Sequence, residues 1–116
     1  MNYEDRVTKE YVEDALAAKC EIVVGSYTGD GNATKNIDLG FRPKAVLVIE
    51  NGGKVGYYSG SQYTYGGLAL PGKPVVLGGR SALVISSTGF IVYKHSDYDY
   101  IRINLSGSTY YYLAFK

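Results

Sequence analysis

The stretch from residue 22 to residue 50 constrains the fold more than any other part of the chain. Apolar Ile22-Val23-Val24 leads into the turn sequence Gly29-Asp30-Gly31-Asn32, and a second run follows from Ile37 to Phe41. Asp-Gly between two alternating runs is typical of a β-hairpin, because the turn needs a positive φ that glycine adopts at little cost. A third apolar run extends from Ala45 to Ile49. The stretch therefore predicts three successive strands, the first two joined as a hairpin.

The rest of the chain continues this pattern of short strands separated by glycine- and serine-rich turns. The strands are expected at 21–27, 34–39, 44–50, 54–58, 75–78, 82–86, 90–95, 100–105 and 109–115. Short strands at this spacing are typical of an antiparallel sandwich or barrel. No helix-length period interrupts them, which argues against a doubly wound α/β fold. We expect a mainly β domain at 20–116, an antiparallel, jelly-roll-like β-sandwich.

Two of these runs, 45–49 and 82–85, are apolar at every position. A strand covered on one side only should alternate between apolar and polar residues. These two strands are therefore expected either between packed layers or against a neighbouring subunit. On the second interpretation Val46 and Val48 contribute to an oligomer interface.

The segment at 1–19 is the one part of the chain with a helical pattern, and a short α-helix is expected at 4–19. Val7, Tyr11, Ala15 and Ala18 share one face at helical spacing. A helix of about 14 residues is marginal alone in water, so this face must pack on something. Two arrangements remain open: the helix lies on its own domain, or it forms a parallel bundle with copies of itself, in which case these residues are an oligomer interface.

Composition and charge exclude several functions. The 12 Lys and Arg nearly balance the 11 Asp and Glu, which gives no electrostatic footprint for nucleic acid. A single cysteine, Cys20, allows neither a disulfide framework nor a cysteine-based metal cluster. No apolar run approaches the roughly 20 residues of a membrane-spanning helix. The charged N-terminal residues do not resemble a secretory signal, so synthesis in the cytoplasm is expected.

Catalytic motifs are weak, and we expect no enzyme activity. The only histidine, His95, has no evident nucleophile partner and is interpreted as an edge residue. Residues 67–73 match G-x-x-x-x-G-K, but Pro74 stands where a phosphate loop needs Ser or Thr, and a strand pattern follows.

Acidic residues do not indicate a metal site either. Asp97 and Asp99 flank Tyr98 and could approach one cation, and Asp30 with Asn32 offers a second oxygen pair. Neither pair supplies the oxygen ligands of a calcium loop, and turn formation explains both better. No metal and no cofactor are expected.

The long irregular stretch at 57–81 is the strongest candidate for binding. A connection of this length is usually functional, or it contains an extra hairpin. Tyrosine offers a rigid ring with a polar tip, which suits contact surfaces for sugars or proteins. The candidate ligand-binding residues are Tyr57, Tyr58, Gln62, Tyr63, Tyr65 and Arg80.

Several motifs resemble bacteriophage tail-fibre and receptor-binding proteins. The run VTKEYVEDALA at 7–17 resembles the "A-T-K-x-Y-V-D-x-A" segment of those proteins, with Val7 in place of Ala and Glu13 in place of Asp. Residues 25–31 and 37–46 are similar to the "G-x-Y-x-G-(N/D)-G … I-x-L-G-F-x-P-x-x-V" pattern of β-rich fibre modules. The ending is also similar, with GFIV at 89–92 and YYYLAF at 110–115.

This resemblance implies a virion protein rather than an enzyme. It would be a structural or host-recognition component of a phage or prophage particle, associated as a homotrimer. Its partners would be other virion proteins and a bacterial surface glycan or protein. A stand-alone carbohydrate-binding module is the alternative, with Gln62, Asp97 and Asp99 as polar neighbours of the tyrosines. A small hydrolase is the least supported interpretation, because no acid–base constellation is visible.

Overall fold

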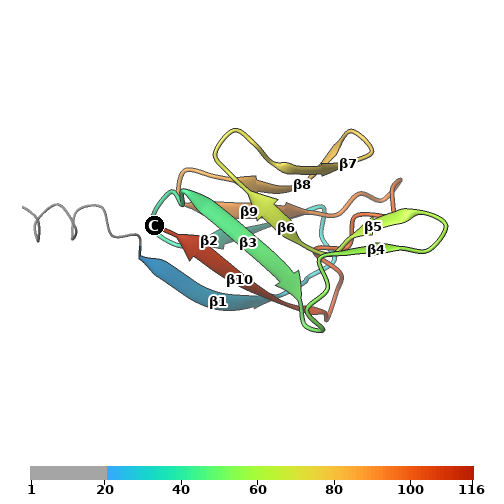
Figure 1. The fold of residues 1–116 in the computed structure, drawn as a ribbon, viewed down its shortest axis with the longest axis horizontal. Helices are drawn as coiled ribbons and strands as arrows, with labels where there is room; N and C mark the ends of the chain where they lie inside the picture. Colours follow the sequence, from blue (N-terminus) through green and yellow to red (C-terminus); the bar gives the residue numbers. More distant parts are fainter. Residues whose placement is uncertain (1–20) are drawn as a thin grey trace, which may run out of the picture.

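The computed structural model describes residues 21–116, and the predicted helix at 4–19 lies outside them (Figure 1). The described residues are mainly β, as the sequence predicts. The strands are β1 (Ile22–Thr28), β2 (Thr34–Asp38), β3 (Ala45–Glu50), β4 (Gly56–Tyr58), β5 (Gln62–Thr64), β6 (Gly67–Ala69), β7 (Val75–Leu77), β8 (Arg80–Ile85), β9 (Gly89–Tyr93) and β10 (Thr109–Phe115).

These strands form two four-stranded antiparallel sheets and one hairpin. The first sheet has the order β1-β10-β3-β6, the second has the order β2-β9-β8-β7, and β4 pairs only with β5. The predicted antiparallel pairing is therefore confirmed.

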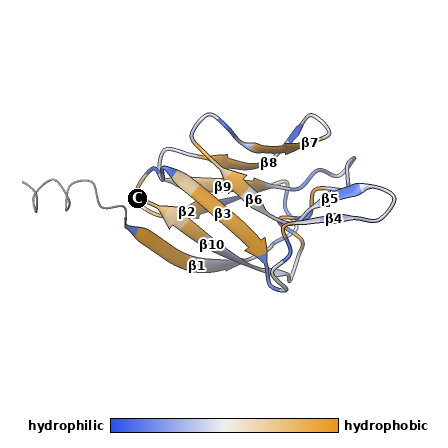
Figure 2. Cartoon of the chain, in the orientation of Figure 1, coloured by the Kyte–Doolittle hydropathy of each residue, from blue (hydrophilic) through white to orange (hydrophobic). Residues whose placement is uncertain are grey.

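One hydrophobic core lies between the two large sheets. Val46, Val48 and Ala114 of the first sheet are fully buried, and so are Phe90 and Val92 of the second. The hydropathy colouring shows apolar residues concentrated along the strands of both sheets (Figure 2). Burial of side chains from two sheets in a single cluster supplies the main driving force for this architecture.

The strand pair expected at the start of the chain is wrong in one respect. β1 pairs with β10 and β2 pairs with β9, so the intervening Asp-Gly turn carries the chain from one sheet to the other. The buried Asn104 side chain holds this turn: its amide donates to Asp30 Oδ1 at 2.8 Å and to the Asn32 carbonyl at 3.1 Å. The Asn32 backbone N–H and the Asn104 amide lower the pKa of Asp30. Asp30 and Asn32 thus build a turn, as expected from their residue types.

The predicted strand at 100–105 is also wrong. Ile101 and Ile103 are buried, but their segment makes only an isolated parallel bridge to Thr64. Hydrogen bonds from two tyrosine hydroxyls, and not those of a β-ladder, hold the backbone of this segment. Tyr27 donates to the Ile103 carbonyl at 2.7 Å, and Tyr110 donates to the Arg102 carbonyl at 2.8 Å. The alternation of apolar residues here reflects anchoring to the core rather than a sheet.

The stretch at 57–81 contains two strands that the sequence pattern did not reveal, β5 and β6. β5 pairs with β4, which falls within the predicted strand at 54–58, so the alternative of an extra hairpin is confirmed. Three-residue strands such as β5 and β6 are too short to show a period of two. Glycine also obscures β6, because Gly66 and Gly67 leave room for close contact with Val48 and Val75.

The two apolar faces of β3 have different surroundings. Val46 and Val48 are fully buried in the core, whereas Leu47 and Ile49 point to the opposite face of the sheet. The positions predicted for an oligomer interface on this strand are therefore core positions of a single chain. A contact made through the outer side of β3 would use Leu47 and Ile49 instead.

Replacing Tyr110 with phenylalanine tests how the 94–108 loop is held. The Tyr110 hydroxyl donates to the Arg102 carbonyl and accepts from the Leu105 N–H at 3.1 Å. Without it two backbone groups lose their partner, and we expect Tyr110→Phe to lower the free energy of unfolding by about 1–3 kcal/mol. Urea denaturation measures this.

The adjacent Tyr111 provides the matched control, because it lies on the same strand with its side chain 44% exposed. Tyr111→Phe should change the free energy of unfolding by less than about 0.5 kcal/mol. Equal effects of the two substitutions would show that the Tyr110 hydroxyl does not anchor the loop.

Candidate functional site

The candidate site lies at the end of the molecule formed by the β4–β5 hairpin and the loop at 94–108, far from the C-terminus (Figure 1). The two segments are joined through Thr64. Its backbone N–H donates to the Tyr100 carbonyl at 2.8 Å, and its carbonyl accepts from the Arg102 N–H at 2.7 Å. The hairpin is thereby fixed to a loop that the core itself anchors. We call this end the tyrosine end, meaning residues 54–65 with 97–102 and Arg80.

Four tyrosine rings form a continuous series across the tyrosine end. Tyr57 packs on Tyr63 across the hairpin with ring centroids 6.2 Å apart. Tyr63 then contacts Tyr100 at 5.2 Å, and Tyr100 contacts Tyr98 edge-on at 5.0 Å. Tilted and edge-on pairs of this kind are favourable because the positive ring edge meets the negative ring face.

Three cationic side chains lie over these rings. The Arg102 guanidinium is 4.6 Å from the Tyr63 ring centre, and Arg80 is 4.5 Å from that of Tyr98. Lys54 Nζ lies 4.5 Å from the Tyr65 ring centre and 5.3 Å from that of Tyr57. Each contact is worth about 0.5–1 kcal/mol at an exposed site. Cations and rings together hold the side chains of this end in defined positions.

The two aspartates of this end each pair with a different arginine. Arg102 donates to the Asp99 carboxylate at 2.7 Å, and Arg80 donates to that of Asp97 at 2.9 Å. The Arg80 hydrogen bond and charge hold the pKa of Asp97 below its usual range. The Asp97 and Asp99 carboxylates thus orient two different guanidinium groups and do not converge on one cation.

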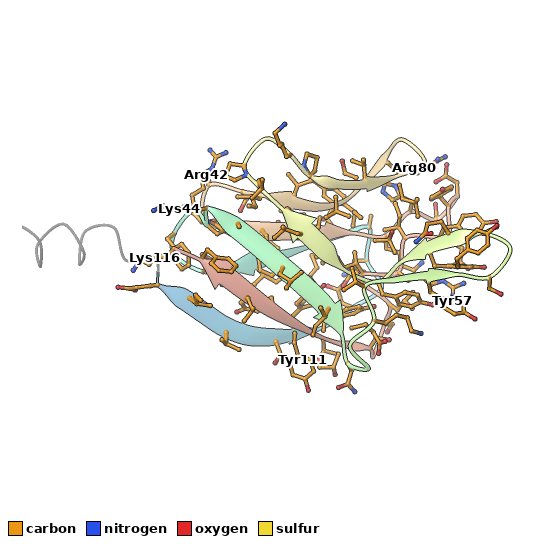
Figure 3. All side chains as sticks on the ribbon, viewed as in Figure 1. Arg42, Lys44, Tyr57, Arg80, Tyr111 and Lys116 are labelled. Atoms are coloured by element: carbon orange, nitrogen blue, oxygen red, sulfur yellow. The ribbon has the colours of Figure 1, made fainter. Side chains whose placement is uncertain are left out.

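Part of the aromatic surface faces solvent. The side chains of Tyr58 and Tyr57 are 71% and 49% exposed, whereas Tyr63 and Tyr65 are half-buried. Tyr57 and Arg80 project from the same end of the molecule in the side-chain view (Figure 3). The arrangement offers ring faces for stacking beside guanidinium donors, which suits recognition of a polar ligand with an apolar face.

The structure brings most of the sequence-predicted ligand residues together. Tyr57, Tyr58, Gln62 and Tyr63 lie on the hairpin, with Tyr58 opposite Gln62 and Tyr57 opposite Tyr63. Tyr65 joins the cluster through Lys54 and the guanidinium of Arg102, whose Nη1 lies 3.4 Å from the Tyr65 hydroxyl. Arg80 lies 16 positions after the end of the hairpin in the sequence and reaches it through Tyr98 and Tyr100.

Sequence reasoning missed four members of the cluster: Lys54, Tyr98, Tyr100 and Arg102. Three of them lie in the 94–108 loop, of which the sequence pattern assigned residues 100–105 to a strand. The repeated Tyr-Asp pattern at 98–100 next to Arg102 was the available signal. Nothing in the sequence showed that this loop meets the hairpin, because residues 64 and 101 are joined only by tertiary structure.

His95 and the G-x-x-x-x-G-K match both have structural roles in the fold. The His95 ring nitrogen Nε2 lies 2.8 Å from the Ser81 carbonyl, and the ring stacks on Tyr93. The G-x-x-x-x-G-K match spans β6 and a tight turn between Leu70 and Lys73, and β7 follows it. In residues 21–116 no three His, Cys, Asp or Glu side chains gather as a metal site would require.

Comparisons with known proteins give no relative. No family model matches the chain, and neither the curated proteins nor the solved structures contain a match. Within the described part of the chain, no helix is long and apolar enough to cross a membrane.

Arg102 should determine how firmly the hairpin is held. It packs on Tyr63, donates to the Asp99 carbonyl at 2.9 Å and pairs with the Asp99 carboxylate. A lysine cannot reproduce this planar set of contacts. We expect Arg102→Lys to lower the free energy of unfolding by about 1 kcal/mol and to speed amide exchange in β5.

Arg42→Lys is the matched control, because Arg42 is an exposed arginine at the opposite end of the molecule (Figure 3). Hydrogen exchange followed by mass spectrometry on both variants gives the comparison. Unchanged exchange in β5 of the Arg102 variant would mean that the hairpin is held by backbone contacts alone.

Proposed function

We propose that this chain is a non-catalytic binding module of a bacteriophage or prophage particle, a β-sandwich that presents its tyrosine end to a bacterial surface glycan. The observation that carries the proposal is the series Tyr57–Tyr63–Tyr100–Tyr98 with arginines stacked on two of its rings. Other virion proteins are the proposed partners at the remaining surfaces.

The path of the chain between the two sheets supports a jelly-roll-like sandwich. The chain enters the first sheet at β1, crosses to the second at β2 and returns to the first at β3. Its end mirrors this path, since β9 pairs with β2 and β10 with β1. Such a framework leaves connections at the ends of the sheets, where binding loops usually lie.

A glycan suits the chemistry of the tyrosine end. Sugar rings combine an apolar C–H face with hydroxyl groups around the edge. Tyrosine rings can stack against the apolar C–H face. The guanidinium groups and the nearby carboxylates of Asp97 and Asp99 can hydrogen-bond to the hydroxyl groups. The side chains are ordered in advance by ring and ion-pair contacts, which reduces the entropy lost on binding.

The virion setting rests on the resemblance of the sequence motifs. Within residues 21–116 the matching residues fall on the scaffold: 25–31 lie in β1 and the turn after it, 37–46 extend from β2 into β3, and 89–92 and 110–115 lie in β9 and β10. They therefore support a shared framework, while the tyrosine end lies outside them and would set the specificity.

A stand-alone carbohydrate-binding module is the second candidate. It is favoured by the position of the cluster, because one chain supplies every ring and cation of the tyrosine end. The two candidates differ in where the protein is found. Mass spectrometry of particles purified from the bacterium that carries the gene should detect this chain together with tail proteins. Detection only outside the particles would favour the stand-alone module.

Ligand binding can be tested on an array of bacterial surface polysaccharides. Tyr57→Ala and Tyr63→Ala should each weaken binding to the recognised polysaccharide about tenfold or more, because a buried stacking contact of about 1.4 kcal/mol corresponds to a factor of ten.

Tyr111→Ala removes a tyrosine of similar exposure far from the hairpin and should leave binding unchanged. Circular dichroism confirms that each variant is folded. Failure of the unmodified protein to bind any polysaccharide, or equal losses in all three variants, would exclude the tyrosine end as a glycan site.

A further inference from the structure

The face of the β1-β10-β3-β6 sheet that points away from the core is apolar across all four strands. Strand register places its residues in rows: three rows are apolar apart from Ser26 and the hydroxyl of Tyr111, and a fourth row at the edge of this face, Thr28-Thr109, is polar. The three rows are Ile22-Phe115-Ala45, Val24-Leu113-Leu47-Leu68 and Ser26-Tyr111-Ile49. We call these residues the outer face.

Exposure on the outer face is unusually large for apolar side chains. Val24 is 71% exposed, Leu68 57%, Ile22 55% and Tyr111 44%. Between them lies a shallow hollow of about 180 Å³ lined by Val24, Leu47, Ile49, Tyr111, Tyr112 and Leu113. Single exposed apolar residues are normal, but a contiguous patch indicates a surface that another element covers.

The other large sheet shares this property only in part. On its edge strand β2 the exposed positions are Thr34, Asn36 and Asp38. Val76 of β7 is 57% exposed, against four well-exposed apolar side chains on the outer face, so within residues 21–116 the outer face is the larger exposed apolar surface of the two sheets.

The chain itself leads to the outer face. β1 is an edge strand of the sheet, and its first residue, Ile22, belongs to the outer face. Residues 1–20 are thus attached at one corner of the patch. A tethered segment of this kind has an effective concentration in the millimolar range, which favours it over any free partner.

The sequence of residues 1–20 fits this surface in pattern and size. Val7, Tyr11, Ala15 and Ala18 would share one side of a helix. A helix of about 14 residues is about 21 Å long. A seven-residue strand is about 23 Å long and four strands span about 15 Å, so one helix would cover much of the sheet.

Charge is complementary as well. Residues 1–20 contain five acidic and three basic side chains. Lys44 and Lys116 flank the corner where the chain enters: the Lys44 N–H donates to the Phe115 carbonyl, and the Lys116 N–H donates to the Glu21 carbonyl. Lys116 Nζ also pairs with the Glu21 carboxylate at 3.9 Å, so the complementary charge for residues 1–20 comes from Lys44. Arg42 lies at the same end of the molecule (Figure 3).

A second copy of the chain fits the outer face less well. A stable interface buries about 800 Å² on each partner. By the strand dimensions above, the sheet that carries the outer face measures about 23 by 15 Å, which is less than half of that area. A covalently attached segment needs less area, because its connection to the chain has already restricted its translational freedom and packing does not have to offset that loss.

We propose that residues 1–20 fold back as a helix over the outer face of their own sheet, with Val7, Tyr11 and Ala15 toward Val24 and Leu113. Of the two arrangements that the sequence leaves open for this segment, this is packing on its own domain. The proposal is independent of the ligand bound at the tyrosine end.

Paramagnetic relaxation enhancement on the full chain tests the proposal. Cys20→Ser removes the only cysteine, and Glu13→Cys then provides one site for a nitroxide on the polar side of the segment. We expect the amides of Val24, Leu113 and Leu68 to lose most of their peak intensity while those of Val84 and Ile91 on the other sheet keep theirs. Uniform or absent broadening would overturn the proposal.

A mixed sample distinguishes packing within one chain from packing between two chains. Isotope-labelled chains without nitroxide are combined with unlabelled chains that carry it. Full intensity of the outer-face amides in this mixture supports packing within one chain. Broadening in the mixture would instead identify contact between copies and overturn the proposal.

A matched pair of substitutions gives an independent measurement. Val24 and Val76 are exposed valines, each on an edge strand of its sheet, but only Val24 belongs to the outer face. If residues 1–20 cover the outer face, Val24→Ser should lower the urea midpoint of the full chain clearly more than Val76→Ser, independently of protein concentration. Equal shifts would contradict the proposal.

Discussion

The packing of two tyrosines between the sheets is the interaction on which the rest of the structure depends. Tyr27 of β1 and Tyr110 of β10 are buried and stacked, with ring centroids 5.0 Å apart and an angle of 16° between them. Their rings belong to the core, while their hydroxyls reach the carbonyls of Ile103 and Arg102. Burial raises the pKa of Tyr27, so its hydroxyl remains protonated and able to donate.

This anchoring links the core to the proposed binding end. The loop held by the two hydroxyls continues through Tyr98 and Tyr100, the rings on which Arg80 and Tyr63 pack. The β4–β5 hairpin has no partner strand in either large sheet and leans on this loop through Thr64. A short hairpin is marginal by itself, so its order depends on the loop and, through the loop, on the core.

The first sheet has two apolar faces with different consequences. Its inner face contributes to the core, where Val46 and Val48 are fully buried and do not reach the surface. Its outer face leaves Val24, Leu68 and Tyr111 exposed in residues 21–116. A sheet that is apolar on both sides needs a second cover, and the residues that precede β1 are the nearest source of one.

The sequence by itself determined the mainly β class of the fold and most strand positions, because apolar periodicity and glycine turns act locally. It also indicated the hairpin tyrosines, since their spacing is short. Only the tertiary structure decided that the Asp-Gly turn connects two sheets and that residues 100–105 form an anchored loop. It alone placed Tyr98, Tyr100 and Arg102 beside the hairpin. These features depend on contacts between residues far apart in the chain, such as Tyr27 with Ile103 and Thr64 with Tyr100, and no local pattern encodes such contacts.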